Sequence, residues 1–479
     1  MKKISPKILV GCLVLVLLLE IGGAVYCINS ILPKTSQAEA SELPSTATEL
    51  FGAQAQYSIF QEVPAMTGKA IEFVPMGEVG GGDYQIRAEK TTREEYQQYL
   101  ALLEENGFEK KLDNGENGIE GFVYSAWYQK DSCLLIVSYV KNLSRTMITA
   151  TTDLSLSDHL QYDPSFIAGN REGAKTTFHL EEQSTWISGA GGSVIQLKNG
   201  HFLIIDGGHQ YELPILIEYL ESLTAEGEKP VIEGWFISHA HGDHVGALRA
   251  FIDEQDKGYA DRVYVEGIYF NIPGDDALRI IGGVEHLAGN VTAARVAATY
   301  LTAENGENAK LYQNRLGDRY YFDDITVDVI GTEELLPYEE WDTWNSTSTI
   351  LMCTIEGQKV LLPADADYLE QMEMLKMYDG SYFDLTIYQA PHHGGNVFDE
   401  VTYYFQSIET VIYPHPYTIR VDNSDYAMLA RRIQNQHLQE AAKESVAWGD
   451  GTKIFTFPYE AGQVRSLPAK YNHDPEVKP

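Results

Sequence analysis

The sequence predicts a mixed α/β protein of more than one domain, and three observations support this prediction. The chain has 479 residues, of which 44% are hydrophobic, so it is too long for one domain and can bury more than one core. Short apolar runs typical of strands alternate with helical segments along its second half. Several of these runs end abruptly in histidine or aspartate, which places candidate metal ligands at strand ends.

The first 33 residues are predicted to enter a membrane. A basic start with three lysines precedes the mostly apolar residues 8–28, a run long enough to cross a bilayer. The cleavage-like Ala-Glu-Ala at residues 38–40 lies well beyond that run, so an uncleaved anchor is favoured over a secreted, cleaved form. Because lysines stay on the cytoplasmic side, we expect a cell-membrane protein whose remaining chain lies outside the cytoplasm.

Composition divides the rest of the chain into five parts. Residues 34–56 are rich in Ser, Thr, Ala and Glu and are expected to form a tether. The remaining parts are an α+β accessory domain at 57–152, a linker rich in Ser, Asp and Gly at 153–177, a larger domain at 178–460 and a tail at 461–479.

The accessory domain is predicted to contain one helix and at least three strands. Thr92 and Glu95 form a capping box, apolar residues then repeat with helical spacing, and Gly107 ends the helix. Residues 122–128 and 134–140 form a hairpin, and residues 145–151 add a strand. No residues here have catalytic spacing, so we expect a spacer, docking or substrate-presenting module.

The charge of the chain is strongly negative. It has 69 acidic and 35 basic residues, a net charge of −34, and such a surface repels polyanions. Strong nucleic-acid binding is therefore not expected, whereas cationic or zwitterionic groups are favoured. Some of the 30 tyrosines could form an aromatic wall for a quaternary amine, although most should be structural.

One stretch concentrates the candidate metal chemistry. Residues 231–237 form an apolar run typical of a buried strand, and a dense set of ligand side chains follows it directly. Two histidines in His-x-His spacing point to the same side of an extended chain, and an aspartate and a histidine then reach a second metal as a helix begins near Val245. The four candidate ligands are His239, His241, Asp243 and His244.

Three other strand ends carry further candidates. The hairpin of residues 193–205 ends in Asp206, which is either a turn former or a brace for the metal loop. Residues 361–366 contain Asp365, whereas Asp367 is expected to cap the helix that follows it. The strand of residues 385–391 ends in His392 and His393.

The His-x-His-x-Asp-His stretch resembles the signature of the metallo-β-lactamase-fold hydrolases, and the resemblance covers residues 178–457. It implies an αββα sandwich, in which two mixed sheets lie between helices and a cleft for two divalent metals forms at the strand ends. The metals would be zinc, with manganese as the alternative, and a metal-bridging hydroxide would attack the substrate. By family position Asp243 and His244 serve the second metal, Asp206 supports the loop, Asp365 bridges the metals, His392 is a ligand and His393 contacts substrate.

One histidine of the family pattern has no clear counterpart. Only His286 lies between His244 and His392, and its surroundings are typical of a helix and not of a strand end. An ordinary packed or exposed histidine is therefore favoured over a ligand. The first metal would then depend on His239, His241, Asp365 and water.

The motif pattern, with Asn-Ser-Thr-Ser at residues 345–348, is closest to two branches of the family. These are the hydrolase domain of DNA-uptake competence proteins and the cell-wall phosphorylcholine esterases. The resemblance implies an enzyme that hydrolyses a phosphoester, either a small molecule or a cell-envelope component. Alternatives are a carboxylic ester, lactone or β-lactam hydrolase, a competence-like nuclease, and a non-catalytic wall-binding or sensory module. A nuclease is disfavoured because residues 178–457 contain no basic run for a phosphate backbone.

Overall fold

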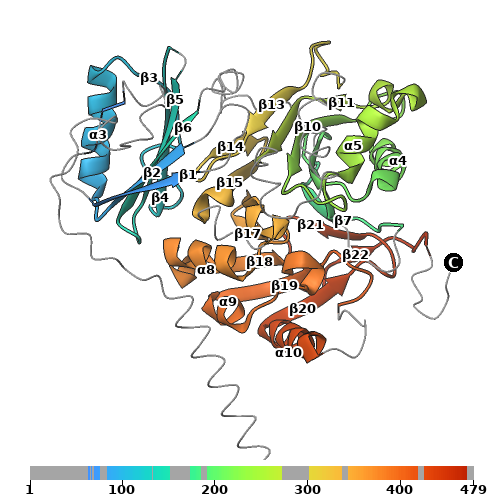
Figure 1. Cartoon of the computed structure of the whole chain (residues 1–479). Coiled ribbons are helices and arrows are strands. Elements are labelled where there is room, and N and C mark those ends of the chain that lie inside the picture. The colour runs from blue at the N-terminus through green and yellow to red at the C-terminus, as the bar shows by residue number, and fades with distance from the viewer. Residues whose placement is uncertain are drawn as a thin grey trace, which may run out of the picture. The chain divides into compact units, whose positions relative to one another are not determined.

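In the residues that it describes, a computed structural model of the chain shows three sheets with helices packed on them (Figure 1). It describes residues 63–64, 66, 70–75, 84–131, 133–151, 173–184, 191–271, 301–336, 343–418 and 426–471, all within one compact unit that spans Ser45–Pro479. The predicted anchor, the predicted tether, most of the predicted linker and His286 lie outside the described residues. None of the helices in the described part is long and apolar enough to span a membrane.

The first sheet is antiparallel, and one helix packs on it. Its strand order is β1-β2-β6-β5-β4-β3, and helix α3 (Arg93–Glu105) begins with the predicted capping box of Thr92 and Glu95. Tyr96, Tyr99 and Leu103 of α3 pack into the core of this sheet. The strands are β1 (Ala70–Pro75), β2 (Tyr84–Glu89), β3 (Glu109–Asp113), β4 (Val123–Lys130), β5 (Cys133–Val140) and β6 (Arg145–Thr151).

The second sheet contains a parallel set of strands whose carboxyl ends share one edge. Its order is β13-β12-β10-β9-β8-β7-β21-β22, and β11 also pairs with β10. Strands β9, β10, β12 and β13 run parallel, while α4 (Leu213–Leu223) and α5 (Gly246–Asp253) pack on the outer face. The strands are β7 (Thr177–Leu180), β8 (Gly192–Gln196), β9 (Phe202–Asp206), β10 (Val231–Ile237), β11 (Tyr264–Val265), β12 (Gly267–Phe270), β13 (Lys310–Gln313), β21 (Lys453–Thr456) and β22 (Arg465–Ser466).

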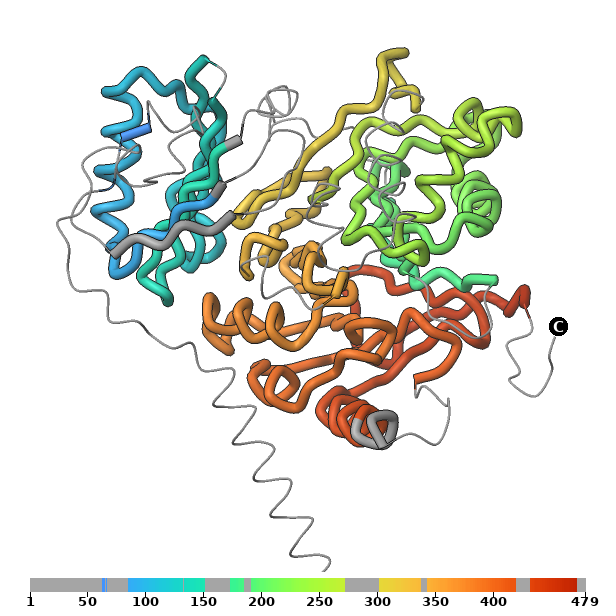
Figure 2. The backbone as a smooth tube through the Cα atoms, in the orientation of Figure 1, coloured from blue at the N-terminus to red at the C-terminus, as the bar shows by residue number. Residues whose placement is uncertain are grey.

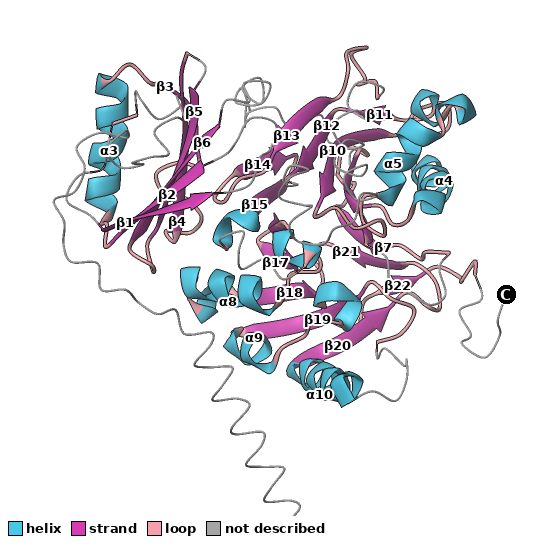
Figure 3. Cartoon of the chain, viewed as in Figure 1, coloured by secondary structure: helices cyan, strands magenta, loops and turns pink. Residues whose placement is uncertain are grey.

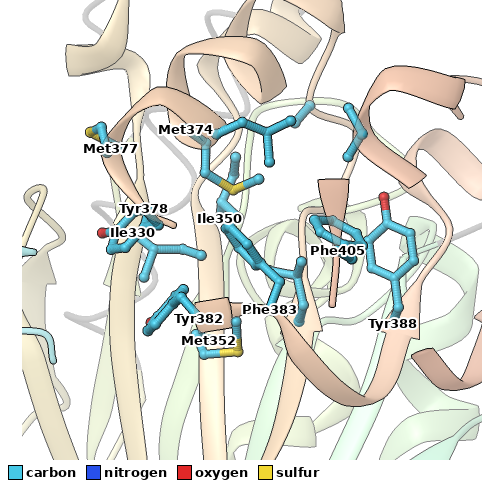
Figure 4. Close-up of a cluster of buried hydrophobic side chains, with 14 of the residues drawn as sticks. Ile330, Ile350, Met352, Met374, Met377, Tyr378, Tyr382, Phe383, Tyr388 and Phe405 are labelled. Atoms are coloured by element: carbon cyan, nitrogen blue, oxygen red, sulfur yellow. The ribbon is translucent and has the colours of Figure 1, made fainter. Parts of the chain in front are cut away.

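The third sheet has the order β14-β15-β16-β17-β18-β19-β20, and its second half is parallel. Helices α8 (Tyr368–Met377), α9 (Asp399–Tyr404) and α10 (Tyr426–Ala441) accompany it (Figure 3). Met374 and Met377 of α8 belong to the same buried cluster as strand residues such as Ile350 and Met352 (Figure 4). The strands are β14 (Arg319–Phe322), β15 (Ile325–Gly331), β16 (Ile350–Ile355), β17 (Gln358–Leu362), β18 (Asp384–Gln389), β19 (Ser407–Tyr413) and β20 (Ala442–Ala447).

The second and third sheets enclose one apolar layer. Phe178 and Phe236 of the second sheet and Val327 and Ile387 of the third are buried in the same cluster. Helices cover the outer faces, so the larger domain is a sandwich of two mixed sheets between helices. The chain returns at its end, where β21 pairs with β7 (Figure 2). Strand β22 lies within the predicted tail that begins at residue 461, so the sheet extends further than the sequence predicted.

The first sheet packs against the sandwich. Val123 and Val140 belong to the same buried cluster as α8, and Trp127 Nε1 donates to Asp318 Oδ1 at 2.8 Å. Arg87 Nη2 donates to the carbonyl oxygen of Glu334 at 2.9 Å. The accessory sheet therefore shares buried apolar and polar contacts with the larger domain.

Candidate metal centre

Strand β10 carries the predicted ligand motif to the edge of the sandwich. The strand ends at Ile237, and helix α5 begins at Gly246. Between them the carbonyl oxygen of His241 accepts hydrogen bonds from the backbone nitrogens of His244 and Val245, both at 3.0 Å. This tight turn holds the four candidate ligands of the motif in a short, ordered loop.

The structure gathers six ligand side chains into two groups at this edge. Within each group the ligand atoms lie within 4.8 Å of one another. The first group is His239, His241 and Asp365, and the second is Asp243, His244 and His393.

The Asp365 carboxylate faces both groups. Its Oδ1 lies 3.3 Å from His244 Nε2 and 3.7 Å from His393 Nε2, and its Oδ2 lies 3.9 Å from His239 Nε2. One carboxylate oxygen of Asp365 therefore lies nearest to each group.

Buried ligand atoms at this edge fit divalent metals of the zinc type. His244 Nε2, Asp365 Oδ1 and His393 Nε2 are buried and have no hydrogen-bond partner. Such atoms are costly to bury unless a further group binds them. Imidazole nitrogen and carboxylate oxygen are ligands that zinc prefers, so the residues present fit the cofactor that the sequence predicted.

The electrostatics of the cluster also favour a cation. Burial opposes charge on His244, but Asp365, Asp206 and Asp243 outweigh it and raise the pKa of this imidazole well above its ordinary value. Burial alone would raise the pKa of Asp365, yet His244 and His393 bring it well below its usual range. The carboxylates are therefore held in their charged form and attract positive charge to the space between the groups.

Asp206 supports the second group from behind. Its Oδ2 lies 2.8 Å from His244 Nδ1, and its Oδ1 accepts a hydrogen bond from the backbone nitrogen of Ser238 at 2.8 Å. This contact orients the His244 ring so that Nε2 faces the cleft. Asp206 adopts a left-handed φ of 62°, so it also makes the turn after β9.

Gly191 is a supporting residue that the sequence analysis did not identify. A Cβ atom at this position would lie 2.4 Å from His244 Nδ1 and 2.8 Å from Asp206 Oδ2. The Gly191 nitrogen also donates to the carbonyl oxygen of Asp243 at 2.9 Å. The Gly-Ala-Gly-Gly stretch at residues 189–192 carries no local signal of this role, because the contact forms only in the folded chain.

The sequence favoured His392 as the ligand of this pair, whereas the ligand groups of the structure contain His393. His393 and not His392 joins the second group, with Nε2 3.3 Å from Asp243 Oδ2 and Nδ1 3.1 Å from the Pro414 carbonyl oxygen. The His392 side chain is 30% exposed, and its Nε2 lies 3.7 Å from Asp365 Oδ2. Both residues have positive φ, 50° and 55°, and this turn buries the second ring instead of the first.

His209 lies near the second ligand group but belongs to neither group. His209 is close enough to Asp243, His244 and His393 for their charges to affect its pKa, which burial lowers. Asp367 caps α8 through the Glu370 nitrogen and belongs to neither ligand group, which confirms the predicted cap.

Comparisons with known proteins agree with this geometry at the level of the superfamily. Residues 193–396 match the family described as the Metallo-beta-lactamase superfamily. The metallo-beta-lactamase fold protein YhfI from Bacillus subtilis is 11% identical over 61% of this chain and 100% of that chain, with a TM-score of 0.31. A Cronobacter sakazakii metallo-beta-lactamase with a HARLDQ motif is 14% identical over 53% of this chain and 87% of that chain, with a TM-score of 0.27.

Because these TM-scores are low, the assignment of residues 193–396 to the superfamily rests on the family match and the ligand geometry. No curated protein matches the chain. Residues 193–396 form a metallo-β-lactamase superfamily domain.

Proposed function

We propose that the protein is a metal-dependent hydrolase that cleaves a phosphoester of a small molecule or of a cell-envelope component. The observation that carries this proposal is Asp365, whose two carboxylate oxygens face two separate ligand groups. Such an arrangement suits two divalent cations held close together.

Two cations of the zinc type, when bound, lower the pKa of water toward about 7 and stabilise negative charge that develops on oxygen. The chain itself supplies the ligands and their orientation. Asp206 holds His244 through Nδ1, and the Pro414 carbonyl oxygen holds His393 through Nδ1. Each imidazole is thereby left with Nε2 toward the cleft.

In this proposal His392 contacts the substrate. It is the partly exposed histidine beside Asp365, and its Nε2 lies on the same side as the first ligand group. An imidazole at this position can donate a hydrogen bond to a substrate oxygen or protonate a leaving group.

The charge of the chain supports a small or envelope-linked phosphoester over a nucleic acid. The net charge of −34 opposes the approach of a long polyanion, whereas a short phosphoester or a zwitterionic head group meets less repulsion.

The proposal also includes the location of the protein: an N-terminal membrane anchor holds the catalytic domain outside the cytoplasm. Protease added to intact cells should then degrade the catalytic domain, and its protection would contradict this topology.

Metal analysis followed by a substrate panel tests the proposed reaction. Full-length protein reconstituted with zinc or manganese should bind close to two metals per chain and hydrolyse chromogenic phosphodiester or phosphorylcholine esters. Asp365→Asn, which keeps the size of the side chain, is the matched control and should be inactive. Turnover of lactone or cephalosporin substrates alone would assign a different ester or amide reaction. Rapid DNA degradation without turnover of small phosphoesters would assign a nuclease, and absence of metal binding would refute the metal centre.

A further inference from the structure

A second cavity, of about 570 Å³, lies at the end of the sandwich opposite the metal centre. Val231 and Glu233 line it at the start of β10, and Lys310 lines it at the start of β13, whereas His239 follows the other end of β10. The seven residues of β10 extend roughly 20 Å. The cavity is therefore separate from the cleft, and its volume is within the range of small-molecule sites.

Aromatic rings form one wall of this cavity. Tyr269 and Tyr312 stack with ring centroids 4.4 Å apart and an interplanar angle of 4°, and Phe322 packs edge-on against Tyr269. A Cβ atom on Gly267 would lie 2.8 Å from the Tyr312 ring, so the glycine lets this ring lie flat against the strand. Tyr321, 38% exposed, adds a ring to the lining.

Carboxylates provide the other wall. Glu233 and Glu266 are half-buried, and Glu304 and Glu307 are exposed on the turn that leads into β13. The Glu233 carboxylate pairs with His201 at 2.8 Å, and Glu266 accepts a hydrogen bond from the Glu304 nitrogen at 2.8 Å. Lys310 and His201 are the basic side chains of the lining, so four carboxylates exceed them in charge.

We propose that this cavity binds an alkylammonium cation and that linear polyamines bind most tightly. An ammonium group is attracted both to the face of an aromatic ring and to carboxylates, and the methylene chain covers the ring surface. The carboxylates lie on three separate segments of the chain, so a ligand with several spaced ammonium groups pairs with more than one of them.

Other classes of ligand fit the cavity less well. In the described residues no three of these carboxylates converge at metal-ligand distance, which argues against a divalent metal ion. The excess of carboxylates repels a phosphate or another anion. The combination of stacked rings with dispersed negative charge favours an organic cation.

Calorimetric titration of spermidine into the full-length protein tests the proposal. The double variant Glu304→Gln/Glu307→Gln removes two carboxylates and should weaken binding by about fivefold or more, as two exposed ion pairs allow. Tyr312→Leu should weaken binding by about threefold because it removes a ring face. Glu94→Gln/Glu105→Gln removes two exposed carboxylates from α3 and should leave the affinity unchanged.

Three outcomes would overturn the proposal. One is an unchanged spermidine affinity in Glu304→Gln/Glu307→Gln. Another is equal loss in the α3 control, which would mean that only net charge attracts the cation. The third is loss of binding in Asp365→Asn, which would place the cation in the metal cleft. Binding that survives Asp365→Asn and falls in Tyr312→Leu supports the proposal, whether or not the domain hydrolyses a phosphoester.

Discussion

The two ends of strand β10 hold charged side chains in different ways. After its carboxyl end, His239, His244 and Asp365 are almost fully buried and lie against one another. At its amino end, the Glu233 carboxylate is half-buried, and the exposed Glu304 and Glu307 line the same cavity. Buried charges require a partner to offset their lost hydration, whereas exposed charges keep their water.

This difference determines how strongly each end responds to substitution. Removing a ligand from the buried end leaves other charges there without compensation, so both metal binding and activity should fall steeply. A carboxylate removed from the exposed end is largely replaced by water and salt.

Substitution of Asp365 should have the largest effect on metal content and activity. Asp365→Ala removes the carboxylate that faces both ligand groups, so the protein should lose at least one metal and about 10³-fold or more in kcat/KM, equal to about 4 kcal/mol. Asp367→Ala is the control and should cost about 1 kcal/mol of stability because the cap of α8 is lost. Metal content and initial rates check both variants, and the reverse ranking would show that the bridging residue is misassigned.

Substitution of each of the two adjacent histidines distinguishes a metal ligand from a residue that contacts substrate. His393→Ala should remove the metal of the second group and reduce kcat/KM by about 10²-fold, since the buried His393 ring joins Asp243 and His244. His392→Ala should keep both metals while lowering turnover, because its ring is partly exposed. Loss of metal in His392→Ala alone would support the ligand that the family resemblance implied.

Gly191 tests whether close packing behind the ligands matters. Gly191→Ala places a methyl group against His244 Nδ1 and should lower the affinity for the second metal by about tenfold. Gly242→Ala is a matched control within the ligand loop, where a Cβ atom would meet nothing within 4 Å. Competition with a chelator measures both affinities. Equal affinities in the two variants would mean that the His244 ring adjusts without cost.

The smallest expected effect concerns the His201–Glu233 pair beside the cavity. Burial lowers the pKa of His201, but the hydrogen bond to Glu233 and the negative charges of Glu233, Glu304 and Glu266 together outweigh burial and raise that pKa above the ordinary value. The pair therefore stabilises the fold below about pH 6.5 and loses this contribution as the pH rises through the raised pKa of folded His201.

Urea unfolding measures this contribution. Glu233→Gln should reduce the free energy of unfolding by about 0.2–1 kcal/mol in mild acid and hardly at all in alkaline solution. In the unsubstituted protein Asn199 donates a hydrogen bond to Glu233 at 2.6 Å, and the amide oxygen of the variant can still accept it. A difference that stays constant with pH would exclude the ionic contribution.

Local sequence patterns were sufficient to predict many helices and strands of the fold. The apolar run at 231–237 coincides with β10, and the helix predicted after Asp367 is α8. In the accessory sheet, β4, β5 and β6 follow the predicted hairpin and strand, but β1, β2 and β3 were not predicted. These three strands lie toward the ends of the strand order. They form because they pair with neighbouring strands, and their own sequences contain no apolar run strong enough to predict a strand.

The sequence by itself determined that metal ligands follow strand ends, because His-x-His-x-Asp-His has a spacing that extended chain and a turn convert directly into convergent side chains. Tertiary structure decided which of His392 and His393 joins them, since two successive residues with positive φ reverse the expected order of burial. It also assembled the second cavity. Glu233, Tyr269 and Tyr312 come from three strands that are distant in sequence, and only the parallel pairing of β10, β12 and β13 brings them together.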